Sequence, residues 1–261
     1  MSQYKIVYDL AFEYLKKISP VKPDELNEYF QTNTGFVAKD MAEVFDRMLF
    51  SAQNSQSMPK VIDYRGKREK IKQILFDFNY AEVLNSYKSE QELYDKFQNE
   101  FKINNASSKY NLWLRWSKSI IDISRFLLKF KDVEDFKRFI DKFEYNQFTK
   151  AALPMIISKE IRGIGFALAC DFMKELGYSD YPKPDVHLID VFSELNLSKN
   201  DQWDNYKSII EMAEVVGETP YKIDKVFWLI SSGYFYLQEK RIGQHKKEFI
   251  EIAKEKLKSL T

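Results

Sequence analysis

Apolar residues recur along most of this chain at intervals of three and four positions, the spacing of an amphipathic helix. In residues 4–17 the apolar face consists of Ile6, Val7, Leu10, Ala11 and Leu15. The same spacing predicts further helices over residues 40–51, 66–76, 89–101, 110–129, 133–143, 201–216 and 244–259. No segment shows the alternating period of two that is typical of a half-buried strand. The pattern therefore predicts an all-α protein.

Glycine and proline mark helix ends near the C-terminus. Gly217 follows the helix over 201–216, where a left-handed residue commonly ends a helix. Thr219 and Pro220 then have the order of an N-cap and a first helical residue. They predict a helix that continues to about residue 231 and ends at Gly233.

Two of the eight glycines, Gly163 and Gly165, lie one residue apart within the segment 158–177. Helical spacing precedes and follows this pair, so the segment predicts a helix, a tight hairpin and a second helix. Glycine permits positive φ and leaves backbone N–H groups uncovered, and the second helix adds partial positive charge at its start. Together these features would form a phosphate site, with Ile164 pointing into the core. A turn that only reverses the chain would show the same pattern.

A second chemical feature follows the hairpin after a short loop. Residues 184–187 read Pro-Asp-Val-His and open another apolar helix, so that Asp185 has the position of an N-cap. A carboxylate there has a defined rotamer, and we expect its pKa to be lowered and the group to be ionised at pH 7. The alternative is an aspartate that only caps a helix, with His187 in its first turn.

The composition is that of a globular protein, and its overall charge gives little support to nucleic-acid binding. It is 44% apolar and 30% charged, and no run is apolar enough to span a membrane. The net charge is +1, although residues 60–72 hold six basic and two acidic side chains, a local charge of +4. The N-terminus does not resemble a signal peptide, so we expect a cytoplasmic, nucleoid-associated protein, or a nuclear one in a eukaryote. Cys170 is the single cysteine, which argues against a disulfide and a four-cysteine iron–sulfur cluster.

The order of helix, Ile-Arg-Gly-Ile-Gly hairpin, helix, loop, Pro-Asp-Val-His and helix in residues 155–192 resembles the helix-hairpin-helix DNA glycosylase superfamily. That superfamily includes endonuclease III and the adenine and 8-oxoguanine glycosylases. The resemblance implies two helical lobes with an active cleft between them. It implies a central lobe over 46–189 that ends in the hairpin, and a second lobe formed by 1–45 and 190–261.

The resemblance also assigns roles to residues. Asp185 would be the catalytic carboxylate that faces a nucleotide flipped out of the duplex. The residues implied to contact DNA at the hairpin and beyond it are Arg162, Gly163, Ile164, Gly165, Phe166 and His187. Carbonyl groups of the hairpin would hold a monovalent cation, and no metal bound by side chains and no other cofactor is expected. The implied partner is double-stranded DNA with a damaged or mismatched base, bound by a monomer.

A polar segment upstream matches a further element of the superfamily. Residues 49–59 lie between two amphipathic helices, where relatives place a loop that enters the minor groove and fills the space left by the flipped base. Gln53, Asn54 and Gln56 are the candidates, because amides can pair with an orphaned base. An ordinary connection between helices would also be polar.

The chain departs from the strand-nicking members of the superfamily at one position. Those enzymes carry a lysine two residues after the second hairpin glycine, because a Schiff base requires a primary amine. This chain has Ala167 there, which favours a monofunctional enzyme that uses water. The alternative is that a nearby lysine, Lys183 or Lys159, supplies the amine.

These features predict a DNA glycosylase of base excision repair that hydrolyses the N-glycosidic bond of a flipped base. Two alternatives remain open at this point. One is a non-catalytic DNA-binding module on the same scaffold, and the other is a helical protein–protein adaptor in which both motifs are ordinary caps.

Overall fold

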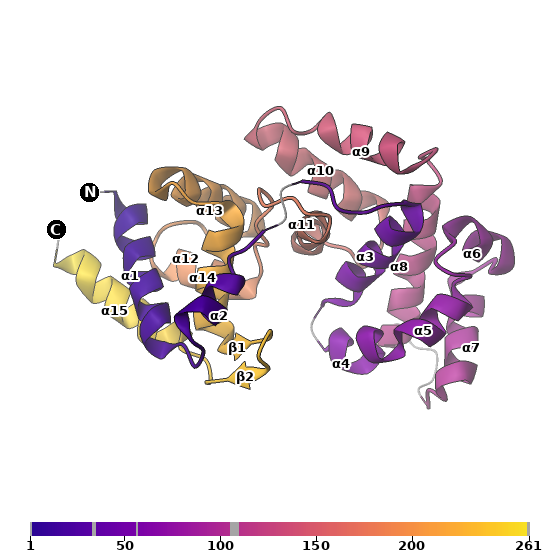
Figure 1. Cartoon of the computed structure of the whole chain (residues 1–261), viewed down its shortest axis with the longest axis horizontal. Helices are drawn as coiled ribbons and strands as arrows, with labels where there is room; N and C mark the ends of the chain where they lie inside the picture. The colour runs from indigo at the N-terminus through magenta and orange to yellow at the C-terminus, as the bar shows by residue number, and fades with distance from the viewer. Residues whose placement is uncertain (1, 33–34, 56, 105–109, 260–261) are drawn as a thin grey trace. The chain divides into compact units, whose positions relative to one another are not determined.

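A computed structural model describes residues 2–32, 35–55, 57–104 and 110–259, and nearly all of their regular structure is helical (Figure 1). The prediction of an all-α protein is confirmed. The exception within this part of the chain is an antiparallel pair of two-residue strands, β1 (Tyr234–Phe235) and β2 (Lys240–Arg241). The chain divides into two compact units, which we call the central unit (Phe36–Leu176) and the terminal unit (Met1–Gly35 with Gly177–Thr261).

The central unit is built around one long helix, α8 (Leu112–Leu127), which packs against α3, α4, α6 and α7. Trp113 and Trp116 of α8 are buried against Phe97, and the indole N–H of Trp116 donates to the Leu49 carbonyl at 3.2 Å. The other helices of this unit are α3 (Met41–Gln53), α4 (Met58–Ile62), α5 (Tyr64–Ile74), α6 (Tyr80–Ser86), α7 (Glu90–Phe101), α9 (Val133–Asp141), α10 (Gln147–Glu160) and α11 (Phe166–Glu175). The two indoles meet edge to face and pack with Phe97 as an aromatic cluster in this core.

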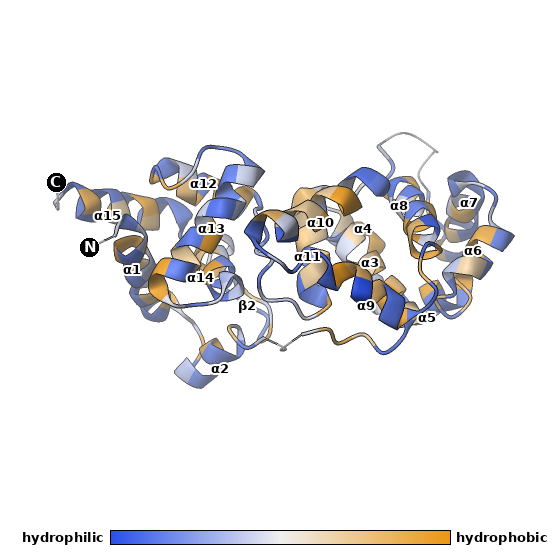
Figure 2. Ribbon diagram, turned by 90° about the horizontal axis from the view of Figure 1, so that it is seen from above, coloured by the Kyte–Doolittle hydropathy of each residue, from blue (hydrophilic) through white to orange (hydrophobic). Residues whose placement is uncertain are grey.

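The terminal unit joins helices from both ends of the chain. They are α1 (Gln3–Ile18), α2 (Pro23–Glu28), α12 (Val186–Glu194), α13 (Gln202–Val216), α14 (Pro220–Ser232) and α15 (Lys246–Lys258). Their apolar faces share one core that includes the fully buried Leu15, Phe192 and Phe227. These helices carry both hydrophobic and hydrophilic residues, as expected for amphipathic helices around a core (Figure 2).

The boundaries between the units lie at residues 35/36 and 176/177, not at the 45/46 and 189/190 that the sequence suggested. The N-terminal boundary is earlier because the whole of α3, from Met41, packs against α8 and α11 of the central unit. The C-terminal boundary is earlier because the loop after α11 is bonded to α14. The Tyr221 N–H donates to the Ser179 carbonyl at 3.0 Å, and the Lys183 N–H donates to Asp224 at 2.8 Å.

The helices expected from periodicity are present with small changes at their ends. Gly217 and Gly233 adopt left-handed backbone at the ends of α13 and α14, as predicted. The spacing missed α2, α4 and α6, which are shorter than two full turns and so have no complete amphipathic repeat. No helix of the described segments is both long and apolar enough to cross a membrane.

Candidate functional site

The predicted hairpin is present between α10 and α11 of the central unit. Gly163 has φ of +86°, a backbone conformation that L side chains rarely adopt, and Ile164 donates its N–H to the Ile161 carbonyl at 3.2 Å. Ile164 is only 2% exposed, so the expectation that it points into the core is confirmed. Gly165 is the N-cap of α11 with φ of −83°, so only the first glycine requires positive φ.

Helix α8 packs against the hairpin and is hydrogen-bonded to it. The Ser119 hydroxyl donates to the Arg162 carbonyl at 2.7 Å, and a Cβ on Gly163 would lie 2.5 Å from the same hydroxyl oxygen. At Gly165 an added Cβ would meet no heavy atom within 4 Å. The two glycines therefore differ in kind: Gly163 is required by the packing against α8, whereas Gly165 leaves its backbone open to the surroundings.

Arg162 is engaged by acidic side chains of its own unit. Its guanidinium makes a two-point bond with Asp122, at 2.6 Å from Nε and 3.0 Å from Nη2, and Nη1 lies 3.2 Å from Glu90. Its backbone N–H also donates to Asp122, at 3.1 Å. The hydrogen bond with Asp122 is the main reason that the pKa of Arg162 is raised. The side chain thus braces the hairpin, and its predicted contact with DNA stays a prediction.

Asp185 occupies the predicted N-cap position, at the start of α12 in the terminal unit. Its carboxylate accepts the backbone N–H of His187 at 2.9 Å and that of Leu188 at 3.4 Å. These bonds use one oxygen, Oδ1, and fix the rotamer of the side chain. Within the described part of the chain, the second oxygen, Oδ2, accepts no hydrogen bond from the cap.

The electrostatics of Asp185 differ from the expectation. Burial raises its pKa above the ordinary value of 3.8, and the neighbouring Lys183 opposes this shift. The nearby carboxylate of Asp224 raises the pKa further, while His187 and its backbone N–H lower it. The predicted lowering was wrong because the cap position alone was considered, and loss of water around the carboxyl outweighs two cap bonds.

Asp224 is a residue that the sequence reasoning missed. It lies on α14, is 3% exposed, and accepts the Lys183 backbone N–H at 2.8 Å. This bond fixes the segment that leads into Asp185. A signal was present, because Asp224 interrupts an otherwise apolar face between Ile223 and Val226. An acidic side chain on the buried face of a helix is expected to form a hydrogen bond or an ion pair with another buried group.

His187 lies in the first turn of α12 and packs edge-on against Trp228 of α14, with ring centroids 6.5 Å apart. Its Nδ1 atom is buried without a hydrogen-bond partner among the described residues. Lys183 is half-buried in the loop before Asp185, and Ala167 is 8% exposed in the first turn of α11. The roles predicted for His187, Lys183 and Phe166 are not decided by these placements.

The candidates for a minor-groove wedge lie at the end of α3. Gln53 is 4% exposed, and Asn54 donates its side-chain N–H to Asp171 of α11 at 2.8 Å. Gln56 lies outside the described residues. Neither described amide is free to pair with an orphaned base in this conformation, so the wedge assignment stays a prediction.

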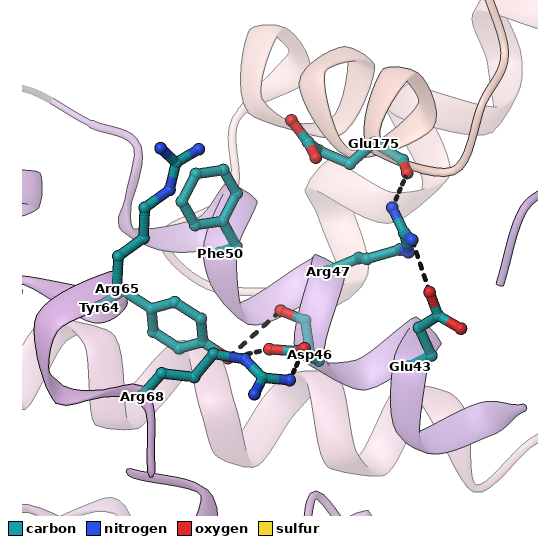
Figure 3. Close-up of a pocket in the computed structure, with 8 residues that line it drawn as sticks. All are labelled: Glu43, Asp46, Arg47, Phe50, Tyr64, Arg65, Arg68 and Glu175. Carbon is teal, nitrogen blue, oxygen red and sulfur yellow. Dashed lines mark hydrogen bonds and ion pairs between the residues drawn. The ribbon is translucent and has the colours of Figure 1, made fainter. Parts of the chain in front are cut away.

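A pocket of about 260 Å³ opens on the central unit between α3, α5 and the end of α11 (Figure 3). Its lining residues are Glu43, Asp46, Arg47, Phe50, Tyr64, Arg65, Arg68 and Glu175. Arg47 bonds the Glu175 carbonyl at 2.6 Å and Glu43 at 2.5 Å, and Arg68 bonds Asp46 at 2.6 Å. Tyr64 also donates to Asp46. Most of the polar lining is therefore paired within the pocket.

Two solved structures are similar to this chain over most of their length. One is the 8-oxoguanine glycosylase/lyase of Methanocaldococcus jannaschii in complex with DNA containing 8-oxoguanine, with a TM-score of 0.54, 20% identity, and coverage of 84% of this chain and 94% of the other. The second is the 8-oxoguanine DNA glycosylase of Thermotoga maritima, with a TM-score of 0.51, 16% identity, and coverage of 87% and 96%. The chain has the fold of helix-hairpin-helix DNA glycosylases. No protein-family profile and no curated protein sequence matches it.

The two predicted motifs lie in different units of the fold. The hairpin belongs to the central unit, and Asp185, Lys183 and His187 belong to the terminal unit. At these levels of identity the likeness supports the fold and leaves the individual residue roles to be tested.

The two hairpin glycines should respond differently to alanine. Gly163→Ala forces a left-handed alanine and displaces the Ser119 hydroxyl, so we expect a loss of about 2 kcal/mol in the free energy of unfolding of the central unit. Gly165→Ala should cost less than about 1 kcal/mol, the difference between glycine and alanine at an N-cap. Urea unfolding followed by tryptophan fluorescence measures both, since Trp113 and Trp116 lie in the central core. Equal losses would contradict this account of the hairpin.

The raised pKa of Asp185 predicts that Asp185→Asn stabilises the protein at neutral pH. A folded-state pKa above the unfolded one favours the protonated form, so the penalty on Asp185 is absent at acidic pH. It appears as the pH rises through the raised pKa. Asparagine keeps the cap. We expect a melting temperature a few degrees higher at pH 7, at about 2–4 °C per kcal/mol, and no gain near pH 3.

Asp201→Asn is the matched control for this experiment. Asp201 caps α13 through the same pattern of two backbone N–H bonds but is exposed, so its replacement should bring no gain at pH 7. A gain for the Asp201 variant, or none for the Asp185 variant, would show that burial of the Asp185 charge is not costly.

Proposed function

We propose that this protein is a DNA glycosylase of base excision repair that removes a damaged or mismatched base from duplex DNA. The observation that carries the proposal is the capped, partly buried Asp185 carboxyl on a fold shared with two DNA glycosylases. Both motifs that the superfamily uses, a hairpin and a carboxylate at a helix start, occur here in the same order along the chain.

The hairpin would hold the DNA backbone. The first N–H groups of α11 lack acceptors within the helix, and Gly165 puts no side chain in front of them. A phosphate oxygen could therefore approach these groups and the positive end of the helix dipole. The Ile161 carbonyl accepts one hydrogen bond in the turn and keeps a second lone pair, which fits the proposed monovalent cation at the hairpin.

Asp185 would act on the reacting sugar. Breaking an N-glycosidic bond builds positive charge on the sugar ring, and a carboxylate close to it stabilises that charge. A pKa raised toward the working pH also suits a general base that takes a proton from the attacking water. The bonds to His187 and Leu188 hold one oxygen in place, and the other oxygen can face the sugar or the water.

We propose that the enzyme acts without a covalent amine intermediate. The position that carries lysine in the strand-nicking enzymes is Ala167, which is nearly buried in the first turn of α11. Lys183 is the alternative source of an amine, since its charge acts on Asp185. The ammonium of Lys183 would instead help keep the Asp185 carboxylate ionised.

The similar structures suggest which damaged base should be tested first. Both similar structures are of 8-oxoguanine glycosylases, and one was solved with DNA containing that base. We therefore place 8-oxoguanine first in a panel that also contains uracil, hypoxanthine, alkylated purines and mismatches.

The excision panel tests the function directly. The purified protein should release a free base from at least one duplex in single-turnover reactions, and Asp185→Asn should reduce the rate at least 100-fold, as expected for loss of a group that acts on the transition state. DNA affinity should change little, because the asparagine keeps the cap. Affinity with no release from any substrate would identify a non-catalytic DNA-binding module instead.

The pathway without an amine has its own test. Incubation of enzyme and substrate with sodium borohydride should trap no protein–DNA adduct, and product strands should break only after alkali treatment. Lys183→Gln should retain base release at a rate within about tenfold of the wild type. A trapped adduct that disappears in the Lys183 variant would assign the amine to Lys183 and overturn the monofunctional assignment.

A further inference from the structure

The arginines of the central unit divide into two groups. This unit contains seven arginines, which are Arg47, Arg65, Arg68, Arg115, Arg125, Arg138 and Arg162. Five of them lie within 4 Å of a carboxylate of the same unit. Arg65 and Arg115 have no carboxylate partner among the described residues. A guanidinium that is already paired contributes little attraction to a phosphate, whereas an unpaired one contributes its full charge.

Arg65 is the unpaired arginine beside α3. Four other cations of the run 60–72 are bound to acids of their own surface, in the pairs Lys67–Asp63, Arg68–Asp46, Lys70–Glu100 and Lys72–Asp77. The exposed Arg65 guanidinium lies over the ring of Phe50, 5.1 Å from its centroid. Figure 3 shows it turned away from the ion pairs that Arg47 and Arg68 make. Stacking on a ring holds the side chain without using its N–H donors.

Arg65 also stands next to the segment expected to enter DNA. Phe50 is near the end of α3, three residues before Gln53 and four before Asn54. The amides of those two residues are buried or bonded in this conformation. The group at this end of α3 that is ready to meet an anion is therefore the stacked guanidinium.

Arg115 is the unpaired arginine beside the hairpin. It precedes Ser119 by four residues on α8, so both side chains lie on the same face of the helix. That face is turned to the hairpin, because Ser119 bonds the Arg162 carbonyl. A Cβ on Gly163 would also lie only 4.0 Å from the Arg115 carbonyl oxygen. The Arg115 side chain is half-buried on this face.

We propose that Arg65 and Arg115 are the arginines of the central unit that contact DNA phosphates, one beside the end of α3 and one beside the hairpin. The paired arginines, including Arg162 of the hairpin, shape the protein surface. This inference rests on the proposed function for its partner, a duplex DNA backbone. It assigns the positive charge of the interface to residues that neither motif contains.

The salt dependence of DNA binding tests the assignment. The logarithm of the binding constant falls linearly with the logarithm of the salt concentration. Each phosphate contact by a cation makes this negative slope steeper by about 0.9. Binding of an undamaged 20-base-pair duplex is measured by fluorescence anisotropy at several potassium chloride concentrations. Arg65→Gln and Arg115→Gln should each reduce the magnitude of the slope by about one, and the double variant should reduce it by about two. Arg65→Lys and Arg115→Lys should restore it, because lysine keeps the charge.

Two matched controls separate a contact from a general loss of charge. Arg138→Gln and Lys70→Gln each remove one positive charge from a residue paired with an acid, Asp135 and Glu100 respectively. Both should leave the slope within experimental error of the wild type. Melting curves of all variants verify that each protein is folded.

The outcomes separate this inference from the proposed function. Unchanged slopes for both arginine variants, or equal reductions in the controls, overturn the assignment even if the enzyme releases bases. Reduced slopes without base release support the assignment and identify a binding module. Absence of any salt-sensitive DNA binding by the wild type overturns both.

Discussion

The hydrogen bond from Ser119 to the Arg162 carbonyl connects the hairpin to helix α8, which also carries the aromatic core of the central unit. One face of α8 carries Trp113 and Trp116 into the aromatic core, and another supplies Ser119 and Asp122 to the hairpin. A turn with positive φ has little intrinsic preference for one conformation, because glycine is permissive. Here the carbonyl, the N–H and the guanidinium of Arg162 are all bound by α8. The hairpin is therefore held ready by the same helix that organises the core, and its rigidity depends on that core.

The terminal unit shows the opposite arrangement, since its candidate catalytic group is held at an electrostatic cost. Asp185 loses water on folding and lies near the buried carboxylate of Asp224, and both effects raise its pKa. The cap bonds and the charge of Lys183 offset only part of this cost. A structure selected for stability alone would place an uncharged residue at this position. Because perturbed pKa values cluster at functional sites, this electrostatic cost marks Asp185 as a candidate for the proposed chemistry.

The sequence predicted those parts of the site that depend on neighbours along the chain. Gly163, the cap at Asp185 and the ends of α13 and α14 follow from local backbone rules, and the structure has them where they were expected. What the sequence did not reveal comes from distant partners. Asp122 and Arg162 are 40 residues apart, and Lys183 and Asp224 are 41 apart. The first pairing decides whether Arg162 is free. Burial, together with the nearby Asp224 carboxylate, raises the pKa of Asp185, and no local pattern contains that information.

The same argument explains why a net charge of +1 is compatible with a DNA-binding surface. Affinity for phosphate depends on cations that remain unpaired at the interface, and total charge counts paired and unpaired groups alike. Most arginines of the central unit are balanced by a neighbouring acid. The remaining attraction would come from backbone N–H groups at the hairpin and from a few cations with defined positions. Under the proposed function, such a surface would bind DNA through the positions of a few cations more than through its total charge.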